Sequence, residues 1–393
     1  MLHILLLRSF FLMRRGLHPL SVHLGQAAAN ATAIQQYSSK FSQDFSPERM
    51  VEMVRGIKMY QSHPFAPQRL PTETVWRKGA TSLLKPADDC AQGNDANSPQ
   101  RPLLLVPSLI NKSYILDLTE ERSLMRWMNA QGIRTYLLDW GDISIDAEAR
   151  NMSMSDIVTH RLCEAFKYLS LQHDSKVDVM GYCMGGTMLI GAASVAQEHI
   201  ERIVLLAAPW DFHTNSGGER NELARAVRIW SPIVMPTIKE RGVLPSSYVQ
   251  ALFASLGSEE TVQKFINFSQ MDQDSDRARF FVSVEDWLND DVDIPGAIAQ
   301  ECIQNWFLKN DTAQGRWFVN DKVVRVADIS ADMLVITSRR DRLVPYECAL
   351  SVLHQSAPNK CSVIEAATGH IGMIVGKSAI DKIWTPMMEW LKA

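Results

Sequence analysis

The sequence has few cysteines, and their spacing does not suit a metal site. Its 393 residues include six cysteines, none of which forms a CxxC pair or stands beside a histidine at metal-ligand spacing. We therefore expect no metal and no zinc site. Scattered cysteines in a chain of this size suit a reducing compartment, so we expect a cytoplasmic protein in which most cysteines are small buried hydrophobic residues.

The sequence also lacks an excess of positive charge. Forty Lys and Arg residues stand against 44 Asp and Glu residues, which gives a formal net charge of -4. A chain without a basic field has no composition-level attraction for phosphate backbones. We expect no nucleic-acid partner.

A long uninterrupted apolar run is absent as well. Residues 1–20 are apolar, but Arg8 interrupts them and Arg14 and Arg15 follow. The runs on either side of Arg8 are too short to span a bilayer, and the basic residues follow the apolar stretch, where a signal peptide would put them first. We expect no cleaved signal. The segment could be an interfacial helix that lies on a membrane or on an apolar granule. The alternative is a helix docked on the domain, or a frayed leader.

The sequence does contain enough apolar material, 46% of its residues, to bury a full α/β core and carry an insertion. From residue 99 onward short apolar strands alternate with amphipathic helices, a pattern typical of crossover units in a mostly parallel sheet with helices on both faces. We predict a core of residues 99–210 and 326–393. Residues 1–98 are predicted to be a helical segment and linker, in which a helix starts at Ser46 and Pro47.

The rhythm of strand and helix stops between residues 211 and 325. We predict that this stretch is a helical cap inserted over the carboxyl edge of the sheet. Its aromatic side chains either bury within the subdomain or line a substrate channel; they are Phe253, Phe265, Phe268, Phe280, Phe281, Trp287, Trp306 and Phe307.

One stretch, VDVMGYCMGGT at residues 177–187, combines a strand, a Gly-x-Cys-x-Gly box and the start of a helix. This is the pattern of a nucleophile elbow, in which a central residue on a strained turn needs glycines two positions away on either side. Cys183 is then a candidate nucleophile, and the N–H of Met184 a first oxyanion donor. The alternative is a tight turn that buries an inert cysteine.

An elbow enzyme needs an acid and a histidine later in the chain, in that order. Asp341 follows the strand DMLVITS and His370 follows the strand CSVIEA, so both stand at expected strand ends. Other acids fit less well: Asp139 and Asp142 precede Cys183, Asp211 follows an earlier strand, and Asp332 precedes its strand. The sequence therefore predicts a Cys183–His370–Asp341 acyl-transfer site.

Several segments in order now resemble one family: LLLVPSLINKSYILDL, RSLMRWMNAQG, MGYCMGGT, DIPG at residues 293–296, and TGHIGMIVG. Together, over about residues 101–392, they are similar to the polyhydroxyalkanoate synthases (PhaC), α/β-hydrolase-fold acyltransferases with cysteine where lipases carry serine. The resemblance implies Cys183 as nucleophile, His370 as base and Asp341 as its acidic partner. It also implies polymerisation of (R)-3-hydroxyacyl-CoA with release of CoA, and no cofactor beyond the CoA thioester substrate.

Within that resemblance, the second oxyanion donor is expected in the VPSLINK loop, at Ser108, Leu109 or Ile110. The segment before the core is short, as in members that work with a helical partner subunit, so the expected partners are such a subunit or a homodimer, the growing polyester and the surface of polymer granules. Arg342 stands where such synthases often carry histidine.

Two other classes remain open from the sequence. A cysteine hydrolase, either an acyl-CoA thioesterase or a polyester depolymerase, would use the same three residues and differ only in its product. A non-catalytic granule-associated protein would need none of them.

Overall fold

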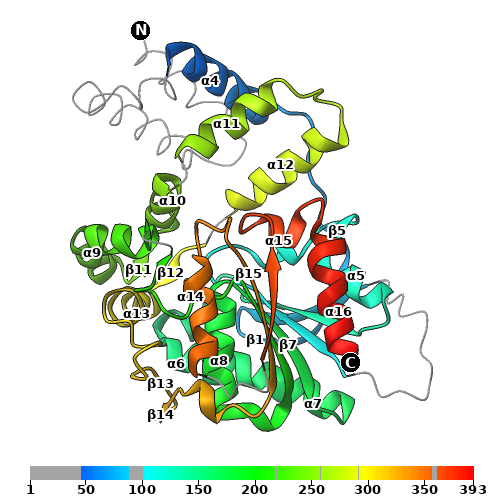
Figure 1. Ribbon diagram of the computed structural model, residues 1–393, viewed down its shortest axis with the longest axis vertical. Helices are drawn as coiled ribbons and strands as arrows, with labels where there is room; N and C mark the ends of the chain where they lie inside the picture. Colours follow the sequence, from blue (N-terminus) through cyan, green and yellow to red (C-terminus); the bar gives the residue numbers. More distant parts are fainter. Residues whose placement is uncertain (1–45, 88–100, 217–218, 257, 291, 356–360) are drawn as a thin grey trace. The chain divides into compact units, whose positions relative to one another are not determined.

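The computed structural model describes residues 46–87, 101–216, 219–256, 258–290, 292–355 and 361–393 (Figure 1). These residues form two compact units, one containing residues 46–68 and 246–290 and the other residues 69–245 and 292–393. Across the described ranges, every helix is too short or too polar to cross a bilayer. The apolar segment at residues 1–20 and the linker at 88–98 lie outside the described residues.

The larger unit is built on one eight-stranded sheet. Its strand order is β1-β2-β6-β3-β7-β8-β15-β16. Only β2 runs antiparallel to its two neighbours, whereas the other pairs are parallel. The strands are β1 (Thr72–Lys78), β2 (Thr81–Pro86), β3 (Leu103–Val106), β6 (Thr135–Asp139), β7 (Val177–Tyr182), β8 (Ile200–Leu206), β15 (Asp332–Ser338) and β16 (Cys361–Ala366). This arrangement, with the elbow after β7, is an α/β-hydrolase fold, as the sequence predicted.

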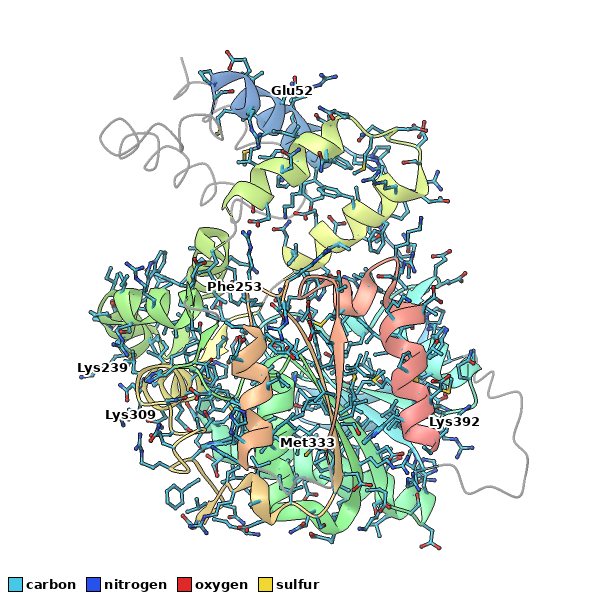
Figure 2. All side chains as sticks on the ribbon, in the orientation of Figure 1. Glu52, Lys239, Phe253, Lys309, Met333 and Lys392 are labelled. Atoms are coloured by element: carbon cyan, nitrogen blue, oxygen red, sulfur yellow. The ribbon has the colours of Figure 1, made fainter. Side chains whose placement is uncertain are left out.

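Helices cover both faces of this sheet (Figure 1). On one face lie α5 (Leu124–Ala130) and α16 (Thr385–Lys392), where Trp127 contacts Trp384 with ring centroids 5.7 Å apart. On the other lie α8 (Met184–Ala196) and α14 (Tyr346–Leu350). Because both faces are covered, the central strand β7 is buried at every position, which explains its mostly apolar sequence. Its one charged residue, Asp178, pairs with Arg101 at 3.3 Å. Figure 2 shows the side chains that fill these layers, among them the buried Met333 of β15.

Further elements belong to the larger unit. Its other α-helices are α6 (Met154–Ile157), α7 (Glu164–His173), α9 (Glu222–Arg241), α13 (Gly296–Glu301) and α15 (Gly372–Val375). π-helical turns occupy Val158–Cys163, Cys302–Leu308 and Ile380–Trp384. Two-stranded ribbons pair β4 (Asp117–Thr119) with β5 (Arg122–Ser123), β9 (Asn215–Ser216) with β10 (Glu219–Arg220), β11 (Val243–Leu244) with β12 (Ile294–Pro295), and β13 (Phe318–Val319) with β14 (Lys322–Val323).

In the part of the smaller unit that the structure describes, the helices are α4 (Pro47–Gln61), α10 (Ser246–Leu256), α11 (Ser258–Ser269) and α12 (Asp276–Leu288). Ser46 caps α4 by accepting a hydrogen bond from the N–H of Arg49, as the Ser-Pro start predicted. Gly56 lets α4 approach α11 closely, since a Cβ at this position would collide with the carbonyl of Phe265. The hydrophobic core of the smaller unit is formed by residues of α4, α11 and α12: Met53, Ile57, Tyr60, Val262, Phe265, Ile266, Phe268, Ala278 and Val282.

The structure divides the chain differently from the sequence-based domains in two places. The strands β1 and β2 lie in the stretch 1–98, for which the sequence predicted only helix and loops; Gly79, at φ +58°, makes the turn between them. The predicted insertion 211–325 is also split, because residues 246–290 form a unit with α4 while residues 292–325 belong to the larger unit. Phe265, Phe268 and Phe281 pack in the core of the smaller unit, the first of the two roles open to the aromatic residues.

Candidate active site

Cys183 lies on a sharp turn between β7 and α8. Its backbone has φ +55° and ψ -130°, a conformation that a residue with a side chain rarely adopts, and its N–H donates to the carbonyl of Leu206 at 2.9 Å. The glycines around it are required by space. A Cβ on Gly181 would collide with the backbone of Gly186, and one on Gly185 with the carbonyls of Val106 and Pro107. The strained turn therefore has the geometry of a nucleophile elbow.

The side chain of Cys183 is half-buried beside the segment that follows β15. It packs against a small apolar cluster of Val344, Cys348 and Ala349, together with Leu343. The strands β7 and β15 both pair with β8, so their carboxyl ends meet at one edge of the sheet. This edge brings residues that are far apart in the chain to the same sulfur.

Asp341 and His370 meet at this edge. The Nδ1 atom of His370 lies 2.7 Å from Oδ2 of Asp341, whose side chain is buried. The other oxygen of Asp341, Oδ1, accepts the N–H groups of Leu343 and Val344, both at 2.9 Å. Asp341 is thus fixed by its own turn and holds the His370 ring with Nδ1 as the donor, which leaves Nε2 available to a second group. Cys183 is close enough for its charge to raise the pKa of the ring.

Tyr182, the residue before the cysteine, supports the ring from one side. Its ring stacks on His370 with centroids 5.0 Å apart, and its hydroxyl donates to the His370 carbonyl at 3.4 Å. Tyr182 was not among the residues that the sequence predicted for the site. The only signal was an aromatic residue in the box, and its contact with a residue 188 positions later could not be read locally.

The charges around His370 change its acidity. Burial alone lowers the pKa of the imidazole, but the charges of Asp341 and of the Cys183 thiolate, and the hydrogen bonds to both, outweigh burial and raise the pKa above its ordinary value of about 6.5. A more basic imidazole accepts a proton more readily. His370 is therefore suited to accept the proton of Cys183.

A titration of His370 tests this electrostatic arrangement. We expect its midpoint, followed by NMR of the imidazole, to lie above 6.5, and Asp341→Asn to lower it. Because the folded-state pKa is raised, the ion pair's contribution to the free energy of unfolding is complete below about pH 6.5 and is lost as pH rises through the higher folded value. A midpoint at or below 6.5 in the wild type would contradict the arrangement.

The other sequence candidates for the acid have different partners. Asp211 accepts the side-chain amide of Asn310 at 2.8 Å and the N–H of His213 at 2.9 Å. Asp139 accepts the hydroxyl of Ser113, and Asp142 the hydroxyl of Ser144. Asp332 is exposed at the start of β15. Of these candidates, Asp341 is the one that carries the hydrogen bond to His370.

The loop that follows β3 lies against the elbow. The carbonyls of Val106 and Pro107 approach Gly185 so closely that no side chain fits there. Met184 is the first residue of α8, so its N–H has no partner within the helix. In the loop, the N–H of Ile110 donates to Oγ of Ser108 at 3.2 Å. Of the donors that the sequence suggested, the N–H of Ile110 thus already has a partner, and Met184, Ser108 and Leu109 stay candidates.

The described residues contain no group of three or more His, Cys, Asp and Glu side chains placed to hold a metal ion. A cysteine on an elbow, a basic histidine and a buried carboxylate can form and resolve a covalent acyl-enzyme.

Comparison with known proteins finds relatives of one named kind. A family model described as "Poly-beta-hydroxybutyrate polymerase (PhaC) N-terminus" matches residues 92–128. The "Poly(3-hydroxyalkanoate) polymerase subunit PhaC" of Haloferax mediterranei is 27% identical over 325 residues, which cover 82% of this chain and 64% of that protein. The chain is similar to poly(3-hydroxyalkanoate) polymerases.

A shorter member of that group matches along more of its length. The "Poly(3-hydroxyalkanoate) polymerase subunit PhaC" of Thiocystis violacea is 26% identical over 75% of this chain and 81% of its own length. The match to the Haloferax polymerase spans slightly less than two thirds of that relative. Among solved structures, the monoacylglycerol lipase of Paleococcus ferrophilus superposes with a TM-score of 0.46 at 13% identity, covering 74% of this chain and 95% of the lipase.

Proposed function

We propose that this chain is an acyltransferase that polymerises (R)-3-hydroxyacyl-CoA into polyhydroxyalkanoate and releases CoA. The observation that carries the proposal is the strained Cys183 elbow facing the hydrogen-bonded His370–Asp341 pair. Similarity to proteins named poly(3-hydroxyalkanoate) polymerase supports the choice of substrate.

The first half-reaction loads the enzyme. His370 accepts the proton of the Cys183 thiol, and the sulfur attacks the carbonyl carbon of the CoA thioester. The carbon–sulfur bond to CoA breaks as the bond to Cys183 forms, and His370 returns the proton to the departing CoA sulfur. Exchange of one thioester for another changes the free energy little, which suits a cysteine nucleophile.

The second half-reaction extends the polymer. The 3-hydroxyl of another hydroxyacyl unit gives its proton to His370, and its oxygen attacks the acyl group on Cys183. An ester bond forms, the bond to sulfur breaks, and the thiolate of Cys183 recovers the proton. Asp341 holds the imidazole in the required tautomer through Nδ1 and stabilises the imidazolium.

The oxyanion of each tetrahedral intermediate is assigned to two backbone donors. One is the N–H of Met184 at the start of α8. In the loop after β3, the N–H of Ile110 already donates to Oγ of Ser108. The carbonyl of Pro107 faces Gly185, and in a trans peptide the next N–H, that of Ser108, points the opposite way. Leu109 is therefore the favoured second donor of the three that the sequence suggested.

The substrate and product are tested together by one incubation. With (R)-3-hydroxybutyryl-CoA, we expect free CoA and insoluble polyester to appear in proportion. CoA release with only free 3-hydroxybutyrate as product would replace the polymerase by a thioesterase. The incubation is repeated with a helical partner subunit of a related synthase, since several relatives are named as subunits; association with that subunit, homodimerisation and binding to granules remain parts of the proposal.

The role of Asp341 gives a separate prediction. Asp341→Asn keeps the size of the side chain but removes the charge that holds the proton on Nδ1, so we expect the rate of CoA release to fall at least about a hundredfold. The matched control is Asp211→Asn, at a carboxylate bonded to Asn310 and His213. Full activity of the Asp341 variant together with inactivity of the Asp211 variant would show that Asp211, and not Asp341, is the acid that orients His370.

A further inference from the structure

The indole of Trp140 reaches the loop that carries the proposed second oxyanion donor. Trp140 directly follows β6 and is 4% exposed. Its Nε1–H donates to the carbonyl oxygen of Pro107 at 3.0 Å, in a buried environment. Pro107 is the first residue after β3, two positions before Leu109, so the hydrogen bond fixes the start of the loop.

The same carbonyl also touches the elbow. A Cβ on Gly185 would collide with the oxygen of Pro107, so this oxygen lies between the Trp140 indole and the first turn of α8. A peptide group is planar, so fixing the Pro107 carbonyl also fixes the direction of the next N–H and the path of the chain into Leu109. The geometry of the loop relative to Met184 thus depends on one side-chain hydrogen bond.

A second contact fastens the far end of the loop to the same segment. The hydroxyl of Ser113 donates to Oδ1 of Asp139 at 3.0 Å, and that oxygen also accepts the N–H of Gly141 at 3.2 Å. Asp139, the residue before Trp140, therefore holds Ser113, while Trp140 itself holds Pro107. The loop is attached at both ends to the turn after β6.

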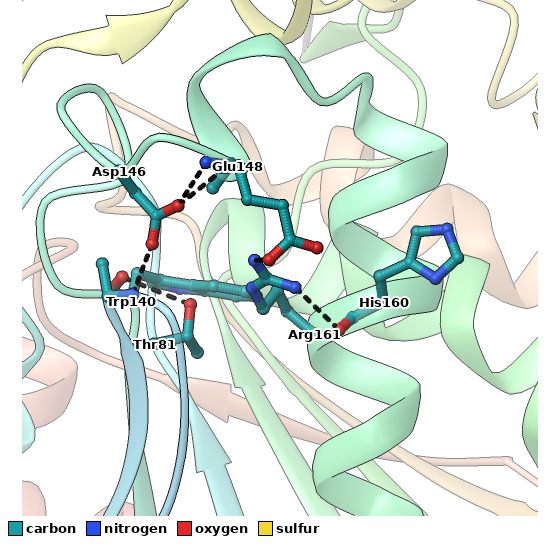
Figure 3. A network of polar contacts seen from close by, with 8 residues as sticks. Thr81, Trp140, Asp146, Glu148, His160 and Arg161 are labelled. Carbon is teal, nitrogen blue, oxygen red and sulfur yellow. Dashed lines mark hydrogen bonds and ion pairs between the residues drawn. The ribbon is translucent and has the colours of Figure 1, made fainter.

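Further polar contacts hold the segment that follows β6, which begins with Trp140, as Figure 3 shows. The hydroxyl of Thr81, on β2, donates to the Trp140 carbonyl at 3.4 Å. Asp146 accepts the N–H of Ala80, and the fully buried Arg161 pairs with Glu148 at 2.9 Å. Gly141, at φ +65°, has no room for a Cβ against the carbonyl of Ala80. Hydrogen bonds and close backbone packing thus hold the turn after β6, which suits a positioning role.

We propose that Trp140 is a positioning residue that holds the Pro107–Ser113 loop so that its N–H donor faces the oxyanion formed at Cys183. The inference rests on the proposed acyl-transfer function and extends it to a residue that touches neither substrate nor the reacting atoms. It predicts a loss of rate only in reactions that develop an oxyanion. A misplaced donor stabilises the transition state of such a reaction less well, while the thiolate of Cys183 is unchanged.

The test compares two reactions of the same cysteine in the full chain. Acylation by p-nitrophenyl butyrate, followed as the burst of nitrophenol, develops an oxyanion. Alkylation by iodoacetamide is a displacement at a saturated carbon and develops none. We expect Trp140→Phe, which keeps an aromatic ring and removes the N–H donor, to slow acylation about tenfold and to leave the alkylation rate unchanged.

The matched control is Trp384→Phe. Trp384 is also buried, but its Nε1 has no hydrogen-bond partner among the described residues. Replacing it with phenylalanine therefore reduces the volume of the ring but breaks no hydrogen bond. We expect both reactions of this variant to keep wild-type rates. Ser113→Ala, which releases the other end of the loop with a minimal change in size, should slow acylation in the same direction by a smaller factor.

Three results would overturn the proposal: unchanged acylation in Trp140→Phe, equal slowing of acylation and alkylation, or equal slowing of acylation in Trp384→Phe. The nitrophenyl ester separates this test from the proposed polymerase. A wild-type chain that is acylated by the ester but releases no CoA from hydroxybutyryl-CoA would contradict the polymerase and still give the Trp140 comparison. A chain whose Cys183 is alkylated but never acylated would overturn both.

Discussion

Replacing Cys183 with alanine is expected to reduce CoA release from (R)-3-hydroxybutyryl-CoA by at least about 10⁴-fold, because removing the nucleophile of a covalent mechanism removes most of its rate enhancement. The change should leave the fold intact. Cys183 is half-buried, alanine is smaller, and the strained turn is enforced by the glycines around it rather than by the sulfur. Circular dichroism and the thermal midpoint should match those of the wild type.

A second cysteine serves as the control for this variant. Cys163 lies in a π-helical turn, and burial, with nearby Glu198 and Glu164, raises the pKa of its thiol to about 12, so it is a poor nucleophile. We expect Cys163→Ala to keep its activity. Retention of more than a few per cent of CoA release by Cys183→Ala would show that the elbow does not carry the reaction.

The second large effect is expected at His370. Glutamine in its place can form hydrogen bonds but cannot accept a proton at neutral pH, so both the activation of Cys183 and the protonation of the leaving CoA are lost. We expect the rate of CoA release to fall by about 10⁴-fold or more, further than for Asp341→Asn. Single-turnover measurement of acyl-enzyme formation locates the loss in the first half-reaction.

His173 provides the matched control for that substitution. It lies at the end of α7, away from the carboxyl edge of the sheet. Its ring nitrogens form hydrogen bonds with the side chains of Tyr136 and Arg134. His173→Gln should leave the rate unchanged. A His370→Gln variant that forms the acyl-enzyme at the wild-type rate would assign the base to another residue.

The positions of Cys183, Asp341 and His370 could be predicted because each follows a strand of a parallel sheet. Carboxyl ends of such strands lie along one edge, so chain order and strand ends are enough to bring three residues together. The strands β7 and β15 are easy to recognise, since burial on both faces makes most of their residues hydrophobic.

Other features depend on contacts that leave no local pattern. The edge strand β1 is largely exposed and polar, so the sequence from Thr72 to Lys78 does not stand out from a loop. The split of the predicted insertion depends on packing between α4 and α11, in which Gly56 meets Phe265, and the support of the oxyanion loop depends on the Trp140–Pro107 hydrogen bond. In both, residues distant in the chain become neighbours only in the folded protein.

The most direct test of the proposed mechanism is detection of an acyl group on Cys183. The chain is mixed with (R)-3-hydroxybutyryl-CoA, quenched in acid after a few seconds, and examined by mass spectrometry of the intact protein and of its peptides. We predict a mass increase of one or more hydroxybutyryl units, located on the peptide that contains residues 177–187 and absent from Cys183→Ala. CoA release from the wild type with no acyl group on this peptide, or with the group on another residue, would contradict covalent catalysis by Cys183.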